Sequence, residues 1–280
     1  MTGRALLLSS LLAVLSTIGC GADELVDEQQ APTTIGGKAD GLSSPTVQLL
    51  FARTRYQGMR QAGNGAYTRW DAYGVVEVEN LAYQKQVVVH HGECTSPNNC
   101  PWQDTAASYL GPGPGNRERW AFTTPVKEIW GLTGSSSPLL FAIRYGVSGQ
   151  TFWDANGGAD YRLEYGPTPV ALGGSAVLLA SASATTGGLT VKACVKDLAY
   201  TKSVSLVYTT DGWVTVKTAP LAYDAALPGA PSVESWKAQL ALPAAATKLR
   251  FALRYEVAGA VYWDNNLGAD YGLAVPGTLE

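Results

Sequence analysis

Histidine, cysteine and charge are all scarce in this chain of 280 residues. It has two histidines, and charged residues make up 15% of it. The net charge is −3 and no basic block occurs, which disfavours nucleic acids and anionic lipid surfaces as partners because both require clustered Lys and Arg. No Gly-x-Ser-x-Gly, phosphate-loop or dinucleotide-binding motif is present. A nucleophile paired with a histidine base cannot occur in both halves of the chain, because His90 and His91 both lie in the first half.

Long hydrophobic runs are also missing, apart from one near the N-terminus. The run from Ala5 to Ile18 is shorter than the ~20 apolar residues that span a bilayer, and it predicts a secretory signal over residues 1–19. The "STIGC" that ends it is similar to a bacterial lipobox and predicts lipid attachment at Cys20; the alternative is ordinary cleavage nearby with loss of this cysteine. Residues 20–44 predict a flexible tether after it. We therefore expect an exported protein of the cell envelope, anchored by lipid to a bacterial membrane.

The three remaining cysteines are consistent with export. Cys94 and Cys100 lie in a short loop rich in Pro and Asn, which predicts a disulfide in an oxidising compartment. The alternative is a zinc site that these cysteines form with His90 or His91. Cys194 lies in a strand pattern and is predicted to be a buried small hydrophobic residue.

The chain contains two copies of one unit. "FWDANGGADY" at 152–161 and "YWDNNLGADY" at 262–271 match at seven of ten positions, and the likeness continues upstream through "FAIRY" and "FALRY". The landmarks keep their order while the loops differ in length, which indicates two homologous domains rather than a short-period solenoid. We predict a first module over residues 45–165, a short Pro/Gly linker over 166–174 and a second module over 175–280.

Strand patterns dominate both copies. "VVEVE" and "SVSLVYTT" alternate, "LLFAIRYGV" and "LRFALRYEV" are apolar runs, and the 31 glycines and 15 prolines suit many turns. About seven short segments in each unit predict an all-β fold of two tandem immunoglobulin-like antiparallel β-sandwich domains.

The carboxylates of the duplicated turn allow two interpretations besides a structural one. Asp154 with Asp160, and Asp264 with Asp270, could act as acid and base in glycoside cleavage, but each pair lies on one turn, which disfavours catalysis. The same oxygens with the neighbouring asparagines would suit a structural calcium ion, although the EF-hand spacing is incomplete. Tight-turn formation explains Asp, Asn and Gly more simply, so no catalytic residue, metal or cofactor is predicted.

The aromatic residues suggest a sugar-binding surface. The C–H faces of glucose stack on aromatic rings, and its hydroxyls form hydrogen bonds with amides and carboxylates. Four tryptophans lie beside such polar groups or in loops, namely Trp102, Trp153, Trp213 and Trp263. The other four are expected in the core or in domain packing, namely Trp70, Trp120, Trp130 and Trp236.

Taken together, "NLAYQK"/"DLAYTK", a Trp after a polar loop and the closing Trp-Asp-x-Asn-x-Gly-x-Asp-Tyr resemble the family 21 carbohydrate-binding modules, with family 53 close by. The resemblance covers nearly all of both units and implies two non-catalytic modules that bind α-glucan of the starch or glycogen type. The family also occurs in regulatory subunits of protein phosphatase 1, but the phosphatase-anchoring segment, a basic residue followed by Val-x-Phe, is not evident here. The alternatives are a structural or protein-interaction lipoprotein that has lost sugar binding and, less favoured, a glycoside hydrolase. We expect a monomer.

The resemblance also implies which residues contact sugar. A first platform would consist of Trp102 with Trp153, and of Trp213 with Trp263, with Asn156, Asn265 and Asn266 as nearby hydrogen-bonding groups. A second platform would consist of Tyr83, Tyr109, Tyr200 and Tyr223. Because Ala155 stands where the second copy has Asn265, we expect the two copies to differ in binding.

Overall fold

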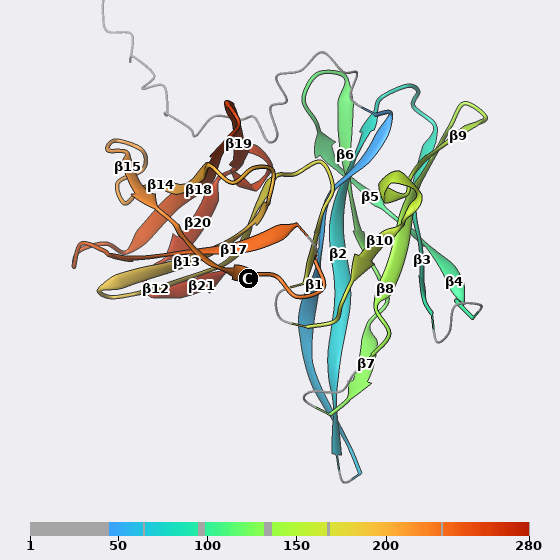
Figure 1. Ribbon diagram of the computed structural model, residues 1–280, viewed down its shortest axis with the longest axis horizontal. Coiled ribbons are helices and arrows are strands. Elements are labelled where there is room, and N and C mark those ends of the chain that lie inside the picture. The colour runs from blue at the N-terminus through green and yellow to red at the C-terminus, as the bar shows by residue number, and fades with distance from the viewer. Residues whose placement is uncertain are drawn as a thin grey trace, which may run out of the picture.

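The computed structural model describes residues 45–63, 65–94, 99–131, 136–166, 169–230 and 232–279. The predicted signal, the predicted lipidation site at Cys20 and the predicted tether lie outside these residues. Two all-β modules follow one another along the chain, which confirms the predicted fold class (Figure 1). Among the described residues, no helix is long and apolar enough to cross a membrane.

The first module consists of two antiparallel sheets. One sheet has the order β11-β1-β2-β6-β5, with β7 paired to β2, and the other has the order β10-β8-β3-β4, with β9 paired to β8. The strands are β1 (Val47–Ala62), β2 (Gly65–Glu79), β3 (Lys85–Glu93), β4 (Trp102–Ala106), β5 (Ser108–Pro112), β6 (Arg117–Thr123), β7 (Lys127–Trp130), β8 (Leu139–Val147), β9 (Gln150–Asp154), β10 (Tyr161–Leu163) and β11 (Val170–Leu172). A 3-10 turn, η1 (Asn156–Gly158), precedes β10.

The second module repeats this plan, but its first two strands are shorter than those of the first module. Its sheets have the orders β16-β17-β13-β12-β21 and β15-β14-β18-β19, with β20 paired to β18. The strands are β12 (Val177–Thr185), β13 (Gly188–Lys196), β14 (Lys202–Thr209), β15 (Lys217–Pro220), β16 (Ala222–Ala226), β17 (Val233–Ala241), β18 (Lys248–Val257), β19 (Ala260–Asp264), β20 (Tyr271–Ala274) and β21 (Gly277–Leu279). The equivalent turn is η2 (Asn266–Gly268).

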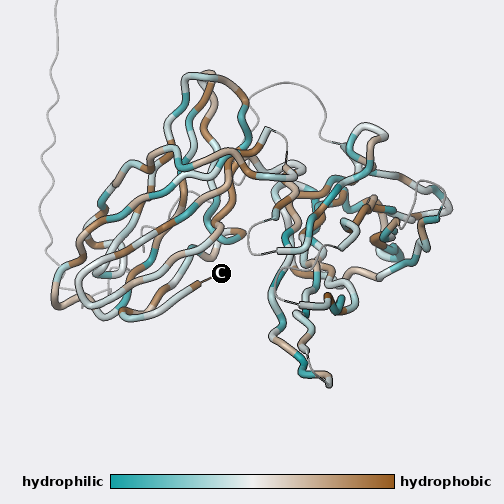
Figure 2. The backbone as a smooth tube through the Cα atoms, turned by 60° about the horizontal axis from the view of Figure 1, so that its bottom comes forward, coloured by the Kyte–Doolittle hydropathy of each residue, from teal (hydrophilic) through white to brown (hydrophobic). Residues whose placement is uncertain are grey.

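Alternation along the strands places one core between the two sheets of each module. In "FAIRY", Phe141, Ile143 and Tyr145 are fully buried, whereas Arg144 points to the opposite face. Phe251, Leu253 and Tyr255 occupy the same positions in the second core. The alternation is visible as brown and teal segments along the strands of both modules (Figure 2). Cys194 on β13 is buried, as predicted.

The Asp of each Trp-Asp pair joins the two sheets of its module. Asp154 on β9 accepts a hydrogen bond of 2.6 Å from the amide of Leu49, where β1 has a register shift. It also accepts from the hydroxyl of Tyr161 at 2.9 Å. Asp264 accepts from the amide of Leu179 at 2.6 Å, at the matching irregularity of β12, and from the hydroxyl of Tyr271. Each carboxylate therefore satisfies a backbone N–H that the bulge leaves without a ladder partner.

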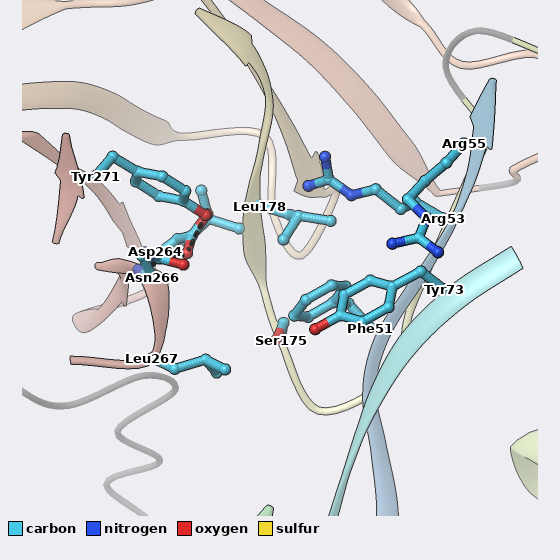
Figure 3. A pocket seen from close by; sticks show the side chains of 11 residues that line it. Phe51, Arg53, Arg55, Tyr73, Ser175, Leu178, Asp264, Asn266, Leu267 and Tyr271 are labelled. Carbon is cyan, nitrogen blue, oxygen red and sulfur yellow. Dashed lines mark hydrogen bonds between the residues drawn. The ribbon is translucent and has the colours of Figure 1, made fainter. Parts of the chain in front are cut away.

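The predicted linker is part of a sheet. Residues 170–172 form β11, which pairs with β1 of the first module. Arg53 donates to the carbonyl of Leu179 at 2.5 Å, and Arg119 donates to the carbonyl of Leu267 at 2.9 Å, so both contacts join the modules. Between the modules lies a cleft of about 230 Å³, lined from the first module by Phe51, Arg53 and Tyr73 and from the second by residues that include Asn266 and Leu267 (Figure 3).

Replacing the buried carboxylate of the second module should cost much stability. We expect Asp264→Ala to lower the free energy of unfolding by about 3 kcal/mol, because the amide of Leu179 and the hydroxyl of Tyr271 would lose their acceptor in a buried place. Urea unfolding measures this loss. The matched variant Asp154→Ala should lose less, because Asp154 is only partly buried and water can replace its carboxylate. Equal, small losses in both variants would contradict the role assigned to the carboxylate.

Candidate carbohydrate-binding surfaces

An aromatic cluster covers the outer face of the sheet β10-β8-β3-β4 in the first module. We call it platform one; it consists of His90, Trp102, Asp104, Arg144 and Trp153. The ring of His90 stacks on Trp102 with centroids 4.9 Å apart, and Trp153 meets the same imidazole edge-on at 6.0 Å. Trp153 is 52% exposed and Trp102 is also exposed, as predicted for both tryptophans.

Polar groups connect the rings of platform one. Asp104 lies 2.7 Å from Nδ1 of His90 and 2.5 Å from the guanidinium of Arg144. The hydrogen bond with His90, helped by the charge of Arg144, lowers the pKa of Asp104. Arg144 also lies over the ring of Trp153, with its guanidinium carbon 5.9 Å from the centroid. The result is a solvent-exposed surface of aromatic faces with charged hydrogen-bonding groups between them.

The second module does not reproduce platform one, and the prediction for Trp213 is wrong. Its side chain is 4% exposed, and its indole N–H donates to Asp270 at 3.1 Å. The cause is a turn centred on Asp211, whose carboxylate accepts hydrogen bonds from Thr209 and Thr215; the bond from Thr209 contributes most to a pKa of about 2 for Asp211. Trp102 begins β4, but Trp213 lies four residues before β15 begins and folds inward.

Two tryptophans, Trp213 and Trp263, were predicted to bind sugar on this face of the second module. Of these two, Trp263 alone is partly exposed. It packs beside Trp213 and Ala252, and Arg254 lies over its ring at 5.8 Å, as Arg144 does in the first module. Val207 in β14 packs against the same cluster. It pairs with Ala252, as His90 pairs with Ala142 in the first copy. Val207 therefore occupies the position that His90 has in the first module.

The asparagines of the duplicated turn mainly support the backbone. The prediction that Asn265 contacts sugar is wrong, because its side chain is completely buried. Its side-chain oxygen accepts a hydrogen bond from the amide of Gly268. Asn156 and Asn266 are exposed, and each donates its side-chain N–H to the carbonyl of the following Asp160 or Asp270 at 3.1 Å.

A second aromatic surface is present in both modules. We call it platform two; it consists of Tyr83, Tyr109 and Trp120 in the first module, and of Tyr200, Tyr223 and Trp236 in the second. Tyr83 and Tyr200 are 99% and 100% exposed, and Tyr109 and Tyr223 are also exposed, as predicted. Tyr109 meets Trp120 edge-on at 5.8 Å, and Tyr223 meets Trp236 at 6.2 Å. Trp120 and Trp236 pack against the cores as predicted, but each also supports an exposed tyrosine.

Buried ion pairs hold platform two in place. Lys85 of "LAYQK" contacts Glu118 at 2.8 Å, and the indole N–H of Trp120 donates to the same carboxylate. Lys202 of "LAYTK", Glu234 and Trp236 repeat this arrangement. The lysine side chains are almost completely buried, so each pair fixes the turn that carries the exposed tyrosine relative to the neighbouring sheet.

The alternatives raised by the sequence receive no support from this geometry. Cys94 and Cys100 form a disulfide, so their thiolates cannot bind zinc. The carboxylates of Asp154 and Asp264 each accept hydrogen bonds from a tyrosine hydroxyl and a backbone amide, which gives them a structural role. In the described part of the chain, no three His, Cys, Asp or Glu residues are grouped closely enough to hold a metal ion.

Some residues of the two platforms were missed by sequence reasoning. His90 was considered only as a metal ligand, and Asp104 and Arg144 were not considered at all. The repeated Arg of "FAIRY" and "FALRY", at Arg144 and Arg254, was the available signal, because its position in an apolar strand places it on the outer face.

Comparison with known proteins relates both modules to one family. The family model of the carbohydrate/starch-binding module (family 21) matches residues 66–164 and 171–274. Protein phosphatase 1 regulatory subunit 3E of Homo sapiens is 43% identical over 89 residues, which are 32% of this chain and 32% of that protein. Glucoamylase 1 of Rhizopus oryzae is 34% identical over 91 residues, 32% of this chain and 14% of that protein. The chain thus spans about a third or less of these curated relatives.

A solved structure of the starch-binding domain of Rhizopus oryzae glucoamylase, in complex with β-cyclodextrin and maltoheptaose, is 28% identical. The match covers 45% of this chain and 100% of that one, with a TM-score of 0.29.

The histidine beneath platform one should make stability depend on pH. His91 is buried, and burial lowers its pKa. The negative charge of Glu93 raises the pKa, but by less than burial lowers it. Below about pH 6.5 the unfolded chain binds a proton that the folded chain does not, so the free energy of unfolding should fall as the pH drops from 7 to 5. Urea unfolding at several pH values measures the slope. His91→Phe should flatten it; an unchanged slope in His91→Phe would contradict the assignment.

Proposed function

Because the chain belongs to the family 21 carbohydrate/starch-binding modules, which its sequence matches twice, we propose that it binds α-glucan of the starch or glycogen type without catalysing a reaction on it. The observation that supports this most strongly is the duplication of platform two. Both copies present a nearly fully exposed tyrosine and a second exposed tyrosine that contacts a partly buried tryptophan, although exposed aromatic rings contribute little to folding.

The two modules have different binding capacities in this proposal. The first carries platform one and platform two, whereas the second carries platform two and the single partly exposed Trp263. Each surface is shallow and binds glucan weakly. Because β11 and the arginine contacts join the modules, a long chain that reaches both gains affinity by avidity, by an estimated 10²–10⁴-fold where the geometry permits it.

The proposal predicts a loss of polysaccharide binding without a loss of stability. The double variant Tyr83→Ala, Tyr200→Ala should migrate faster than the parent in native gels that contain glycogen or amylopectin, because each ring supplies a stacking face. Its urea midpoint should stay unchanged, because both side chains are exposed. The double variant Trp102→Ala, Trp153→Ala should reduce retardation, because it weakens binding by the first module and leaves the second module unchanged. A parent protein that glycogen and amylopectin do not retard would reject the function.

We also infer that the chain is exported and tethered to a bacterial membrane by lipid at Cys20, which supports a role in holding glucan at the cell surface. The sequence of residues 1–20 and the disulfide between Cys94 and Cys100, which suits an oxidising compartment, support this.

Lipid attachment is directly testable in a bacterial host. Cells that express the full chain with radioactive palmitate should label it, and Cys20→Ser should abolish the label and shift the protein from the membrane to the soluble fraction. The matched variant Cys194→Ser changes a buried thiol elsewhere and should keep the label. Label that persists in Cys20→Ser would reject the anchor.

A further inference from the structure

The first module has an extension that the second lacks. Strands β1 and β2 are 16 and 15 residues long, whereas the corresponding β12 and β13 have nine each. The far part of this hairpin projects beyond the sandwich, and the short strand β7 pairs with it there (Figure 1). The extension contributes none of the residues of platforms one and two.

One face of the extension carries an organised aromatic and charged cluster. Arg60 pairs with Tyr67 across the hairpin, and its guanidinium lies 4.7 Å from the tyrosine ring. Trp130 of β7 meets the same ring edge-on at 4.9 Å. Glu128, also of β7, binds Arg60 through two hydrogen bonds of 2.8 and 2.7 Å. Sequence reasoning assigned Trp130 to the core or to domain packing, but its side chain is 52% exposed.

The indole of Trp130 is held in position by its neighbours. A Cβ atom on Gly65 would lie 2.3 Å from the Trp130 ring, so this ring packs directly on the glycine backbone. Tyr67 supports the indole from the side. The remaining surface of the ring faces solvent in a fixed orientation, which reduces the entropy that a ligand would have to overcome.

The same three kinds of group occur in platform one. There, an exposed Trp153 lies beside an arginine that binds a carboxylate, Arg144 with Asp104. On the extension, Trp130, Arg60 and Glu128 provide the aromatic face, the donors and the acceptors. Glu128 also lies 3.7 Å from Nε of Arg69, so its carboxylate is shared by two guanidinium groups, and the donors and acceptor beside the ring suit the hydroxyls of a sugar.

We propose that Trp130, Tyr67, Arg60 and Glu128 form a third glucan-contacting surface, which we call the extension platform. It rests on the proposed function and adds a site that only the first module has. A neutral α-glucan chain stacks a sugar ring on Trp130 while its hydroxyls bind Arg60 and Glu128. Because a polymer offers many sugar rings, this contact adds to those of the other platforms.

The test compares variants of the full chain by native electrophoresis in gels that contain glycogen or amylopectin. Trp130→Ala should weaken the apparent affinity for the polysaccharide about threefold to tenfold, which is the range expected for one aromatic contact. Gly65→Ala keeps the indole but displaces it, and should weaken binding in the same direction. The matched control is Tyr56→Ala, which removes an exposed ring that contacts Trp70 of the same hairpin at a tilt and should leave binding unchanged.

A second background separates this surface from the others. A variant that lacks five aromatic side chains of the other platforms should keep a weak retardation, and adding Trp130→Ala should weaken it further; the five substitutions are Tyr83→Ala, Trp102→Ala, Trp153→Ala, Tyr200→Ala and Trp263→Ala. Urea midpoints check that each variant is folded. If the parent is retarded, but adding Trp130→Ala changes the retardation in neither background, the extension platform is rejected while the proposed function stands. A surface that binds a protein instead of glucan would give this result.

Discussion

One carboxylate in each module connects its two sheets, and the position of the exposed tryptophan follows from it. Asp154 and Asp264 point inward to the bulge of the opposite sheet, where they accept from a backbone amide and from a tyrosine hydroxyl. Because neighbouring residues of a strand point to opposite faces, Trp153 and Trp263 must point outward. The Trp-Asp pair is therefore one structural unit, in which the inward residue closes the sandwich and the outward residue is presented to solvent.

The two copies share platform two and differ in platform one, and the difference has a physical reason. Platform two depends on the buried pairs Lys85–Glu118 and Lys202–Glu234. Losing the lysine of such a pair leaves a mostly buried carboxylate without its cation, which is costly, so the arrangement resists that substitution. Platform one lies on an exposed sheet face, where His90 can be replaced by Val207 without such a cost.

The sequence allowed the fold to be predicted because alternation and the repeat are strong, local signals. The same signals failed where loops decide the outcome. Trp213 was matched to Trp102 because both follow a polar loop, but the turn at Asp211 places Trp213 four residues before the strand and buries it. Trp130 was assigned to the core or to domain packing because it has no partner in the second copy. Its exposure depends on the long hairpin and on Gly65, whose contact no sequence pattern indicates.

The joined modules also constrain how glucan can be bound. With a flexible linker, two weak sites could adjust to a short oligosaccharide, but β11 belongs to the sheet of the first module, and Arg53 and Arg119 fix the second module against it. The distance between the platforms is therefore set by the fold. A short oligosaccharide engages one surface at a time and gains nothing from the duplication, because avidity is lost when the geometry forbids simultaneous contact. Under the proposed function, long or branched chains reach several surfaces at once, so the tandem arrangement favours polymers over individual sugars.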